Sequence, residues 1–267
     1  MLLSVAVFAQ NVYHVTRVSG KLTNLSTGKE VIAGDQLQAS DQILFESIES
    51  YAITIGKELN RFQIKIHDPG AEADKQMLTS IVKDAARPTK MRSLMLARFD
   101  PTETEISNLR NYFGNDKFSV IGDGVEIPLS SQSYPLSENK FIVFFYRVEN
   151  NPISKKIGHN NQTLILDRDK LTTSSVGTVV GNEIPDMAIY QYEASTRRSQ
   201  EITRITLVFV DKNELQKEFS TIIPILRRQR MSDEDIKKYL IEYYYDFYGA
   251  TDSKTIDRIT EEIIKSF

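Results

Sequence analysis

Apolar and polar residues alternate in short runs over much of the first 66 residues. Such alternation is typical of β-strands with one buried face, because successive side chains of a strand point to opposite faces. The runs predict strands at residues 12–18, 31–32, 36–38, 42–45, 51–55 and 62–66. Residues 56–60 between the last two predict a hairpin turn. Residues 10–66 are therefore expected to form a small β domain, and they contain no recognisable catalytic group.

Glycine and short polar residues stand between these strands, where they can supply a positive φ or cap a turn. In order they are Gly20, Gly28, Gly34-Asp35 and Ser40-Asp41. The succession V-S-G-K, G-K, G-D-Q-L, D-Q-I and S-Y-A over residues 18–52 resembles the periplasmic FecR-like domain, with Ser40 in place of a second glycine. The resemblance covers about a fifth of the chain. It implies a compact β domain outside the inner membrane, which in regulatory members communicates with an outer-membrane partner, and it implies no catalysis.

The first nine residues form an apolar run with the length of the h-region of a secretory signal, too short to cross a bilayer as a helix. Val7 and Ala9 fit the small-residue positions before a cleavage site, which leaves Gln10 as the first mature residue. No Lys or Arg precedes Arg17, so the alternative is that this run is a buried first strand. We expect residues 1–9 to be the remnant of a signal peptide and the protein to be periplasmic or otherwise exported. No later apolar stretch approaches the roughly 18 residues of a transmembrane helix.

Clusters of helix-breaking residues follow the β domain, at residues 67–70 and at Arg87-Pro88. A helix is predicted over residues 72–86 from four apolar residues at four-residue spacing: Ala73, Met77, Ile81 and Ala85. A second helix is predicted after Pro101, with Gly114 at its end and one shared apolar face: Ile106, Leu109 and Phe113. Residues 67–116 are thus expected to be a helical connector.

Residues 117–267 show strand patterns first and helix patterns last, which is the order of an α+β fold. Strands are predicted at residues 140–148, 162–166, 187–192 and 202–210. The first of them is a continuous apolar run, typical of a central strand covered on both faces. The expected fold is mainly β plus α+β: a small N-terminal β domain, the helical connector, and a second mixed-sheet domain that ends in a helical hairpin.

Three helices are predicted near the C-terminus. The first follows Asp211, with one apolar face: Leu215, Phe219, Ile222 and Ile223. The second has Ser232 and Asp235 as a capping box and ends at Gly249. Its apolar residues recur at helical spacing: Ile236, Tyr239, Leu240, Tyr243, Tyr244 and Phe247. Residues 251–253 cap the last helix, with an apolar stripe: Ile256, Ile259, Ile263, Ile264 and Phe267. Because Tyr243, Tyr244, Tyr245, Phe247 and Tyr248 cover more than one helix face, they either pack inside the domain or form an interface with a partner.

The amino-acid composition of the chain excludes several classes of function. The chain has 267 residues of which 40% are hydrophobic, enough for a sizeable core in two domains. With 33 basic and 36 acidic residues its net charge is −3, so no overall field favours nucleic acid or an anionic membrane. The absence of cysteine excludes disulfides, thiolate nucleophiles and cysteine-ligated metals. No transmembrane segment is expected either.

Residues that could carry chemistry are few. His14, His67 and His159 stand far apart, so no local zinc motif is present. Asp167 and Asp169 lie two residues apart at a strand end, where they could bind a cation or act as an acid/base pair; Arg168 and Lys170 favour a solvated charged turn instead. The turn at Asp123-Gly124 has only part of a calcium-loop pattern. A basic run could contact phosphate or acidic glycans, or be a solvated linker: Arg87, Lys90, Arg92 and Arg98.

No phosphate-binding loop, nucleophile elbow or metalloprotease motif occurs in the sequence. We therefore assign no catalytic, cofactor-binding or metal-ligating residue and expect no cofactor. The expected function is that of a non-enzymatic extracytoplasmic protein-binding or scaffold protein of the cell envelope, with an envelope protein as partner and a Tyr-rich C-terminal helix as a candidate interface. Two alternatives stay open: a regulatory sensor of the FecR type, and an accessory hydrolase whose site collects Asp167, Asp169 and His159.

Overall fold

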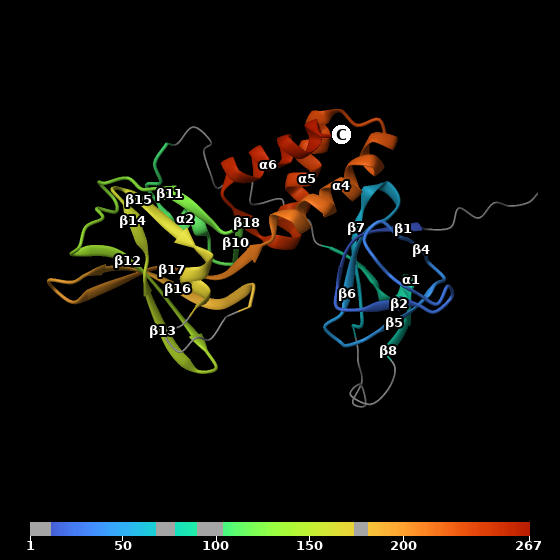
Figure 1. Cartoon of the computed structure of the whole chain (residues 1–267), viewed down its shortest axis with the longest axis horizontal. Coiled ribbons are helices and arrows are strands. Elements are labelled where there is room, and N and C mark those ends of the chain that lie inside the picture. The colour runs from blue at the N-terminus through green and yellow to red at the C-terminus, as the bar shows by residue number, and fades with distance from the viewer. Residues whose placement is uncertain (1–11, 68–77, 90–103, 174–180) are drawn as a thin grey trace, which may run out of the picture. The chain divides into compact units, whose positions relative to one another are not determined.

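The computed structural model describes residues 12–67, 78–89, 104–173 and 181–267, so the predicted signal peptide lies outside the described residues. The chain forms two compact units (Figure 1). Unit 1 comprises Met1–Lys90 and Lys217–Ser232, and unit 2 comprises Met91–Gln216 and Asp233–Phe267. Within the described residues, no helix is both long and apolar enough to cross a membrane. The expected mixture of several sheets with a C-terminal helical pair is confirmed.

Unit 1 is built on two antiparallel sheets, with strand orders β4-β1-β6-β7-β9 and β3-β2-β5-β8. Its strands are β1 (Val12–Ser19), β2 (Leu22–Asn24), β3 (Lys29–Glu30), β4 (Gln36–Gln38), β5 (Gln42–Phe45), β6 (Tyr51–Ile55), β7 (Arg61–Lys65), β8 (Leu78–Ile81) and β9 (Ala86–Pro88). One core joins both sheets, since Val15 and Ile64 of the first sheet cluster with Leu22 and Ile43 of the second. All four side chains are fully buried.

Most of the strands predicted for unit 1 are confirmed. Those at residues 36–38, 42–45 and 51–55 match β4, β5 and β6, and β6 pairs with β7 in the expected hairpin around the short 3₁₀ helix η1 (Lys57–Leu59). The strand expected at residues 31–32 lies two residues earlier, as β3. Val31 still donates its backbone N–H to the carbonyl of Leu22 at 2.8 Å, so the ladder continues although the strand has ended.

The turn glycines of unit 1 adopt the backbone conformation that their positions suggested. Gly20, Gly28 and Gly34 have φ angles of 70°, 69° and 97°. At Gly20 a Cβ atom would also collide with the side-chain oxygen of Ser50, so glycine is needed there for space as well as for its φ. Gly20 and Ser50 both belong to the pattern that resembles the FecR-like domain. The resemblance itself stays a prediction.

The helix predicted over residues 72–86 is wrong for the part that the structure describes, residues 78–86. These residues form β8, the single-turn helix α1 (Val82–Ala85) and the start of β9. Pairing with β5 and β7 outweighs the four-residue periodicity, because each strand completes a ladder of backbone hydrogen bonds. Ile81 is 40% exposed and does not share the buried face of Ala85.

The second predicted connector helix is shorter than expected. It is α2 (Leu109–Phe113), capped by the side chain of Asn108, which accepts a hydrogen bond from the backbone N–H of Asn111 at 3.0 Å. Ile106 lies outside the helix and forms a β-bridge with Leu129. Gly114 ends the helix with a φ of 72°, as predicted.

Unit 2 is built on a mixed six-stranded sheet of order β13-β12-β16-β17-β10-β18 and a three-stranded antiparallel sheet of order β11-β15-β14. Its strands are β10 (Lys117–Ile121), β11 (Gly124–Pro128), β12 (Lys140–Val148), β13 (Asn151–Lys156), β14 (Gly158–Asn160), β15 (Thr163–Asp167), β16 (Glu183–Glu193), β17 (Arg198–Val210) and β18 (Ala250–Thr251). The short helix α3 (Arg168–Thr172) follows β15. Among the strands of the described part of this unit, only β10 makes parallel pairs, with β17 and β18. All four strands predicted for this region are present, with β16 and β17 longer than expected.

Strand β12 corrects one detail of the prediction. It occupies residues 140–148 as expected, but only one of its faces is fully buried, with Ile142, Phe144 and Tyr146 in the core. Phe141 and its neighbours on the other face are half-buried. This alternation of buried and half-buried residues is typical of a strand with antiparallel neighbours, here β13 and β16. On the half-buried face, the ring of Phe141 lies 5.2 Å from that of Tyr192 of β16, measured between centroids.

The C-terminal helices agree closely with the sequence. They are α4 (Lys212–Arg228), α5 (Asp233–Tyr248) and α6 (Ser253–Lys265), and α5 packs on α6 with an ion pair of 2.8 Å between Lys237 and Glu261. The predicted apolar residues of α4 and α6 are buried, except Phe267, which is 50% exposed beyond the end of α6. Within unit 1, Glu218 of α4 pairs with Arg17 of β1 at 3.7 Å.

The tyrosines of α5 pack inside the protein. Tyr243 and Tyr244 have no exposed surface, and Tyr245 and Tyr248 are buried as well. The Tyr244 hydroxyl and the Ser119 hydroxyl of β10 lie 2.7 Å apart in a hydrogen bond, which satisfies the polar tip. Burial raises the pKa of Tyr245 to about 12. Of the two readings of this cluster, intramolecular packing is the one that the structure supports.

Candidate functional site

A cavity of about 920 Å³ opens in unit 2 beside β17. One wall consists of residues from α2 and the segment after it: Arg110, Asn111, Gly114, Asn115 and Asp116. The other consists of residues from the β16–β17 hairpin: Asp186, Glu201, Thr203, Arg204, Ile205 and Thr206. We call this the β17 cavity. Its volume is in the range of small-molecule sites.

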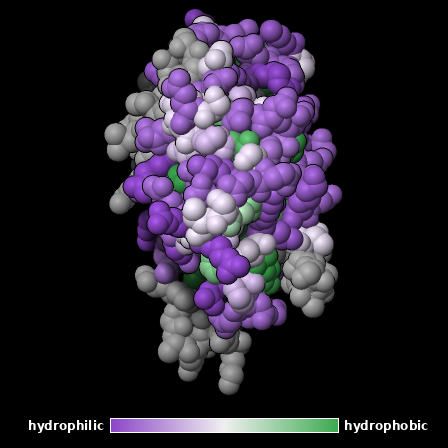
Figure 2. Space-filling model, turned by 90° about the vertical axis from the view of Figure 1, so that its left-hand side faces the viewer, coloured by the Kyte–Doolittle hydropathy of each residue, from purple (hydrophilic) through white to green (hydrophobic). Residues whose placement is uncertain are grey.

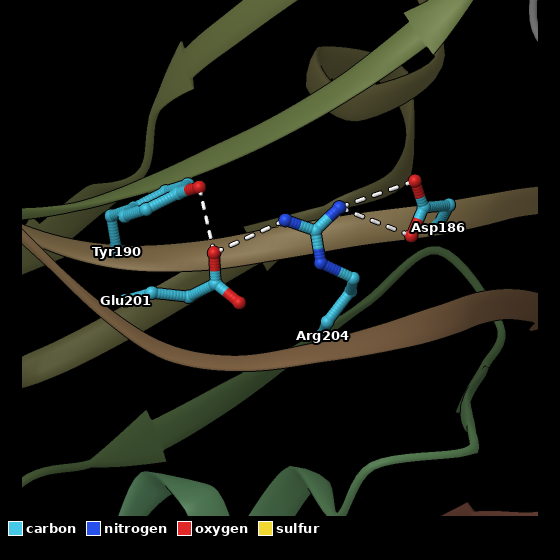
Figure 3. Close-up of polar contacts among 4 residues, drawn as sticks. All are labelled: Asp186, Tyr190, Glu201 and Arg204. Carbon is cyan, nitrogen blue, oxygen red and sulfur yellow. Dashed lines mark hydrogen bonds and ion pairs between the residues drawn. The ribbon is translucent and has the colours of Figure 1, made fainter.

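Four polar side chains of the β16–β17 hairpin form a connected group, which we call the Arg204 network (Figure 3). Three of them line the cavity: Asp186, Glu201 and Arg204. Arg204 lies between two carboxylates. It donates from Nη1 to both oxygens of Asp186 at 3.1 and 3.2 Å, and from Nη2 to Oε2 of Glu201 at 3.1 Å. The hydroxyl of Tyr190 donates to the same Glu201 oxygen at 2.8 Å.

Strand register and bulges bring these four residues together. Tyr190 of β16 and Glu201 of β17 are direct cross-strand partners, and Arg204 faces Ala188. The register shifts between Ile184 and Met187, and Asp186 in that bulge has a φ of 50°. Bulges redirect side chains, and this one allows Asp186 to reach Arg204 from the neighbouring strand.

Hydrogen bonding shifts the pKa values in the network. The hydroxyl of Tyr190 and then the guanidinium of Arg204 lower the pKa of Glu201 below its ordinary value. The same contact with Glu201 raises the pKa of Tyr190 above its ordinary value. The pKa of Arg204 is raised by its hydrogen bonds to Glu201 and Asp186. All three groups therefore keep their ordinary charges at neutral pH, with Glu201 ionised and Tyr190 protonated.

We expect the Tyr190→Phe variant to titrate Glu201 at a higher pH than the wild type, because the hydrogen bond that favours the carboxylate is lost. In the wild type the folded state favours the ionised form of Glu201. This preference therefore stabilises the fold at pH values above the pKa that Glu201 has in the unfolded chain. It is lost as the pH falls through the lowered folded pKa. Carboxyl ¹³C shifts followed by NMR against pH measure this directly. The matched control is Tyr192→Phe, on the same strand. An unchanged Glu201 titration in Tyr190→Phe would contradict the role of the hydroxyl.

The opposite wall approaches the strand edge through Arg110 and Gly114. Arg110 donates from Nε to the backbone carbonyl of Ile202 at 2.7 Å, and Thr203 donates its hydroxyl to the carbonyl of Gly114 at 2.5 Å. The backbone N–H of Thr206 donates to the carbonyl of Asp116 at 2.9 Å. Arg110 thus satisfies a strand carbonyl at a position where a neighbouring strand would otherwise donate an N–H.

The chemistry of the β17 cavity favours binding over proton transfer. A carboxyl pair that performs acid/base catalysis needs one member that holds its proton near neutral pH, which requires a raised pKa. In this cavity Arg204 engages both Asp186 and Glu201, and the pKa of Glu201 is lowered. Fixed donors and acceptors remain, and these can recognise polar groups of a ligand.

The candidate acid pair weighed from the sequence lies at a second cavity, of about 480 Å³. Asp167 and Asp169 both line it, together with Lys155, Lys156 and Lys170. Asp167 caps α3, since its side chain accepts the backbone N–H of Lys170 at 3.1 Å, and it lies 3.5 Å from the ammonium of the same lysine. This favours the charged turn over an acid/base pair.

The histidines do not join this cavity. His159 is absent from its lining and contacts the backbone carbonyl of Asn161 at 3.0 Å. His67 contacts the carbonyl of Ala85 at 2.8 Å. His14 lies in β1, where burial and then Arg228 lower its pKa. In the described ranges no three His, Asp or Glu side chains gather as metal ligands.

The basic run can be placed only in part. Arg87 is exposed in β9 and donates to the carbonyl of Asp84 at 2.8 Å. Lys90, Arg92 and Arg98 lie outside the described residues. The turn near Asp123 follows Gly122, whose φ is 82°, and the carbonyl of Asp123 accepts the backbone N–H of Arg168 at 2.8 Å.

The sequence did not indicate the Arg204 network. Its members are spread over residues 186–204 in two strands, so their meeting depends on the register of the hairpin. The useful signal was the polar stretch of residues 198–201, which directly precedes the predicted strand 202–210. An expected β16–β17 hairpin would have placed Tyr190 opposite this stretch.

Comparison with known proteins adds no family to this description: the chain matches no protein-family model and no curated protein at a significant level of similarity.

Proposed function

We propose that this chain is a non-enzymatic, extracytoplasmic binding or scaffold protein of the cell envelope, and that unit 2 offers a surface to a protein partner. The Arg204 network carries the proposal. Its carboxylates are engaged by one guanidinium beside an open cavity, an arrangement suited to fixed recognition and not to proton transfer.

The N-terminal part of the chain supports the proposed extracytoplasmic location. The apolar run at residues 1–9 suits a secretory signal, and the turn residues of unit 1 resemble those of an extracytoplasmic FecR-like domain. The main alternative is that the protein is a regulatory sensor of the FecR type, and this alternative is supported by the same resemblance. The β unit would then supply the contact with a membrane partner.

The exposed surface directs the search for the interface. The tyrosines of α5 are buried, so they offer little surface to a partner. Figure 2 shows the side of unit 2 that lies on the left in Figure 1, and its coloured residues are mostly hydrophilic with scattered apolar groups. This face therefore shows no broad apolar patch of the kind that marks a protein interface. The β17 cavity is a better candidate for recognition.

The hydrolase alternative has weaker support. Asp167 and Asp169 do line one cavity, but His159 does not join them and Asp167 is committed to capping α3. Hydrolysis of an envelope glycan by the purified protein, abolished by Asp169→Asn, would favour this alternative over binding.

Site-specific photo-crosslinking in cells tests the proposal. A photoreactive amino acid replaces Asn115, which is exposed on the wall of the β17 cavity, and Glu126, which is exposed on β11, serves as the control position. We expect one protein adduct from Asn115, recovered with the envelope fraction, and none from Glu126. Equal labelling at both positions, or a protein that is not exported, would contradict the proposal.

A further inference from the structure

The charged side chains on the walls of the β17 cavity balance one another. Arg204 lies between Asp186 and Glu201, at 3.1 Å from a carboxylate oxygen of each. Arg110 lines the opposite wall, so two guanidiniums stand against two carboxylates. Asp116 also lines the cavity, but it has another interaction within the protein and is not free to pair with a ligand. The cavity therefore gives no clear preference to a ligand of either charge.

Hydrogen-bond donors remain available on the wall that α2 and the segment after it form. Arg110 donates from Nε to the carbonyl of Ile202 at 2.7 Å, which fixes the position of its guanidinium. Its two Nη atoms donate to no group in the described part of the chain. Asn111 and Asn115 are exposed on the same wall, and the side-chain amide of each supplies donors and an acceptor. This wall can therefore bind the oxygen atoms of a ligand.

The opposite wall, on the β16–β17 hairpin, supplies an acceptor and an apolar surface. Tyr190 and Arg204 both donate to Oε2 of Glu201. Oε1 of Glu201 accepts no hydrogen bond from the residues that the structure describes. The half-buried Tyr190 adds an aromatic ring next to this carboxylate. Together the two walls suit a ligand that both donates and accepts hydrogen bonds.

The backbone of β17 is already bonded along the cavity. The carbonyl of Ile202 accepts from Arg110 at 2.7 Å. The backbone N–H of Thr206 donates to the carbonyl of Asp116 at 2.9 Å. An extended peptide that added as a strand would need these same backbone groups. The cavity therefore favours a ligand that is bound by side chains alone.

An uncharged saccharide has the chemistry that these walls require. Each of its hydroxyls both donates and accepts hydrogen bonds, as the free atoms of the two walls demand. The C–H groups on one face of a sugar ring can pack on an aromatic ring such as that of Tyr190. The cavity, at about 920 Å³, is also large enough for a ligand of this size.

We propose that the β17 cavity binds an uncharged saccharide. Its hydroxyls donate to Oε1 of Glu201 and accept from Arg110 and from the amides of Asn111 and Asn115. The inference goes beyond the proposed function, because it gives unit 2 a second ligand, of another class than a protein. The protein partner and the saccharide are therefore tested by separate measurements.

Binding of the full-length, fluorescently labelled protein to a printed array of neutral and acidic oligosaccharides tests this. We expect binding to uncharged oligosaccharides. Asn111→Ala should weaken binding to the best of them about five-fold, because the hydrogen bonds of one neutral side chain are lost. The matched control is Asn213→Ala, at another exposed helical asparagine of unit 2, which should leave binding unchanged. In an NMR titration of the ¹⁵N-labelled protein with that oligosaccharide, amide shifts should change at residues 110–116 and 201–206.

Three outcomes would overturn the inference: no binding to any uncharged oligosaccharide, equal binding by Asn111→Ala and the wild type, or shifts confined to another surface. Crosslinking at Asn115 separates this failure from that of the proposed function. A protein adduct there without saccharide binding means that the inference fails and the proposed function stands. Saccharide binding without an adduct means the reverse.

Discussion

Phe118→Ala is expected to lower the free energy of unfolding of unit 2 by about 4 kcal/mol, since large-to-small changes of buried phenylalanine cost about 3 to 5 kcal/mol. Phe118 is completely buried in β10, the strand that joins β17 to β18. Its ring lies 4.9 Å from that of Phe113 and 5.3 Å from that of Tyr112, measured between centroids. Alanine would leave a cavity among these rings that the surrounding sheet cannot close. Urea unfolding followed by circular dichroism and tyrosine fluorescence gives the change.

The matched control for this prediction is Phe267→Ala. Phe267 is 50% exposed at the end of the chain, so its loss should change the free energy of unfolding by less than about 0.5 kcal/mol. Comparable losses in both variants would mean that the packing around Phe118 is not what stabilises this unit.

Gly249→Ala is expected to destabilise the protein by about 3 kcal/mol, through backbone strain and collision together. Gly249 links α5 to β18 with a φ of 83°. A Cβ atom there would lie 2.5 Å from the Cβ of Lys117 and 2.6 Å from its carbonyl oxygen. The obstacle includes the backbone of β10, so it cannot move aside as the end of a long side chain could. Thermal and urea unfolding measure the loss.

Gly122→Ala separates the two causes. Gly122 has nearly the same φ, 82°, but a Cβ atom added there would have no neighbouring atom within 4 Å. Only the backbone conformation is penalised there, at a cost of about 1 kcal/mol. A loss in Gly122→Ala as large as in Gly249→Ala would contradict the role of the close approach to Lys117.

The behaviour of individual strands shows where sequence reasoning succeeded. β4, β5 and β6 were predicted with their observed ends, because polar turn residues delimit them and one face alternates. α4 and α6 were predicted from single apolar stripes, which leave only one way to bury the helix. The tyrosine cluster of α5 was harder, since tyrosine suits both a core and an interface. Its placement depended on a hydrogen-bond partner, Ser119, that lies 125 residues away.

Prediction from the sequence failed for the residues around the β17 cavity and for part of the predicted connector. Residues 78–86 belong to the helix predicted over residues 72–86, yet they form strands that complete two sheets of unit 1. Strand β10 pairs only with residues 206–210 of β17, and Arg110 of α2 bonds to the carbonyl of Ile202 beyond them; neither contact follows from a local pattern.

Local patterns by themselves determined several strands of unit 1, the turn glycines, the C-terminal helical pair and the absence of catalytic motifs, because each depends on periodicity or on residues close in sequence. Only the tertiary structure decided the boundary of the units, the Arg204 network and the cavity beside it. These depend on the register between distant strands and on the bulges within them, and a shift of one residue would turn the side chains of Glu201 and Arg204 to the opposite face.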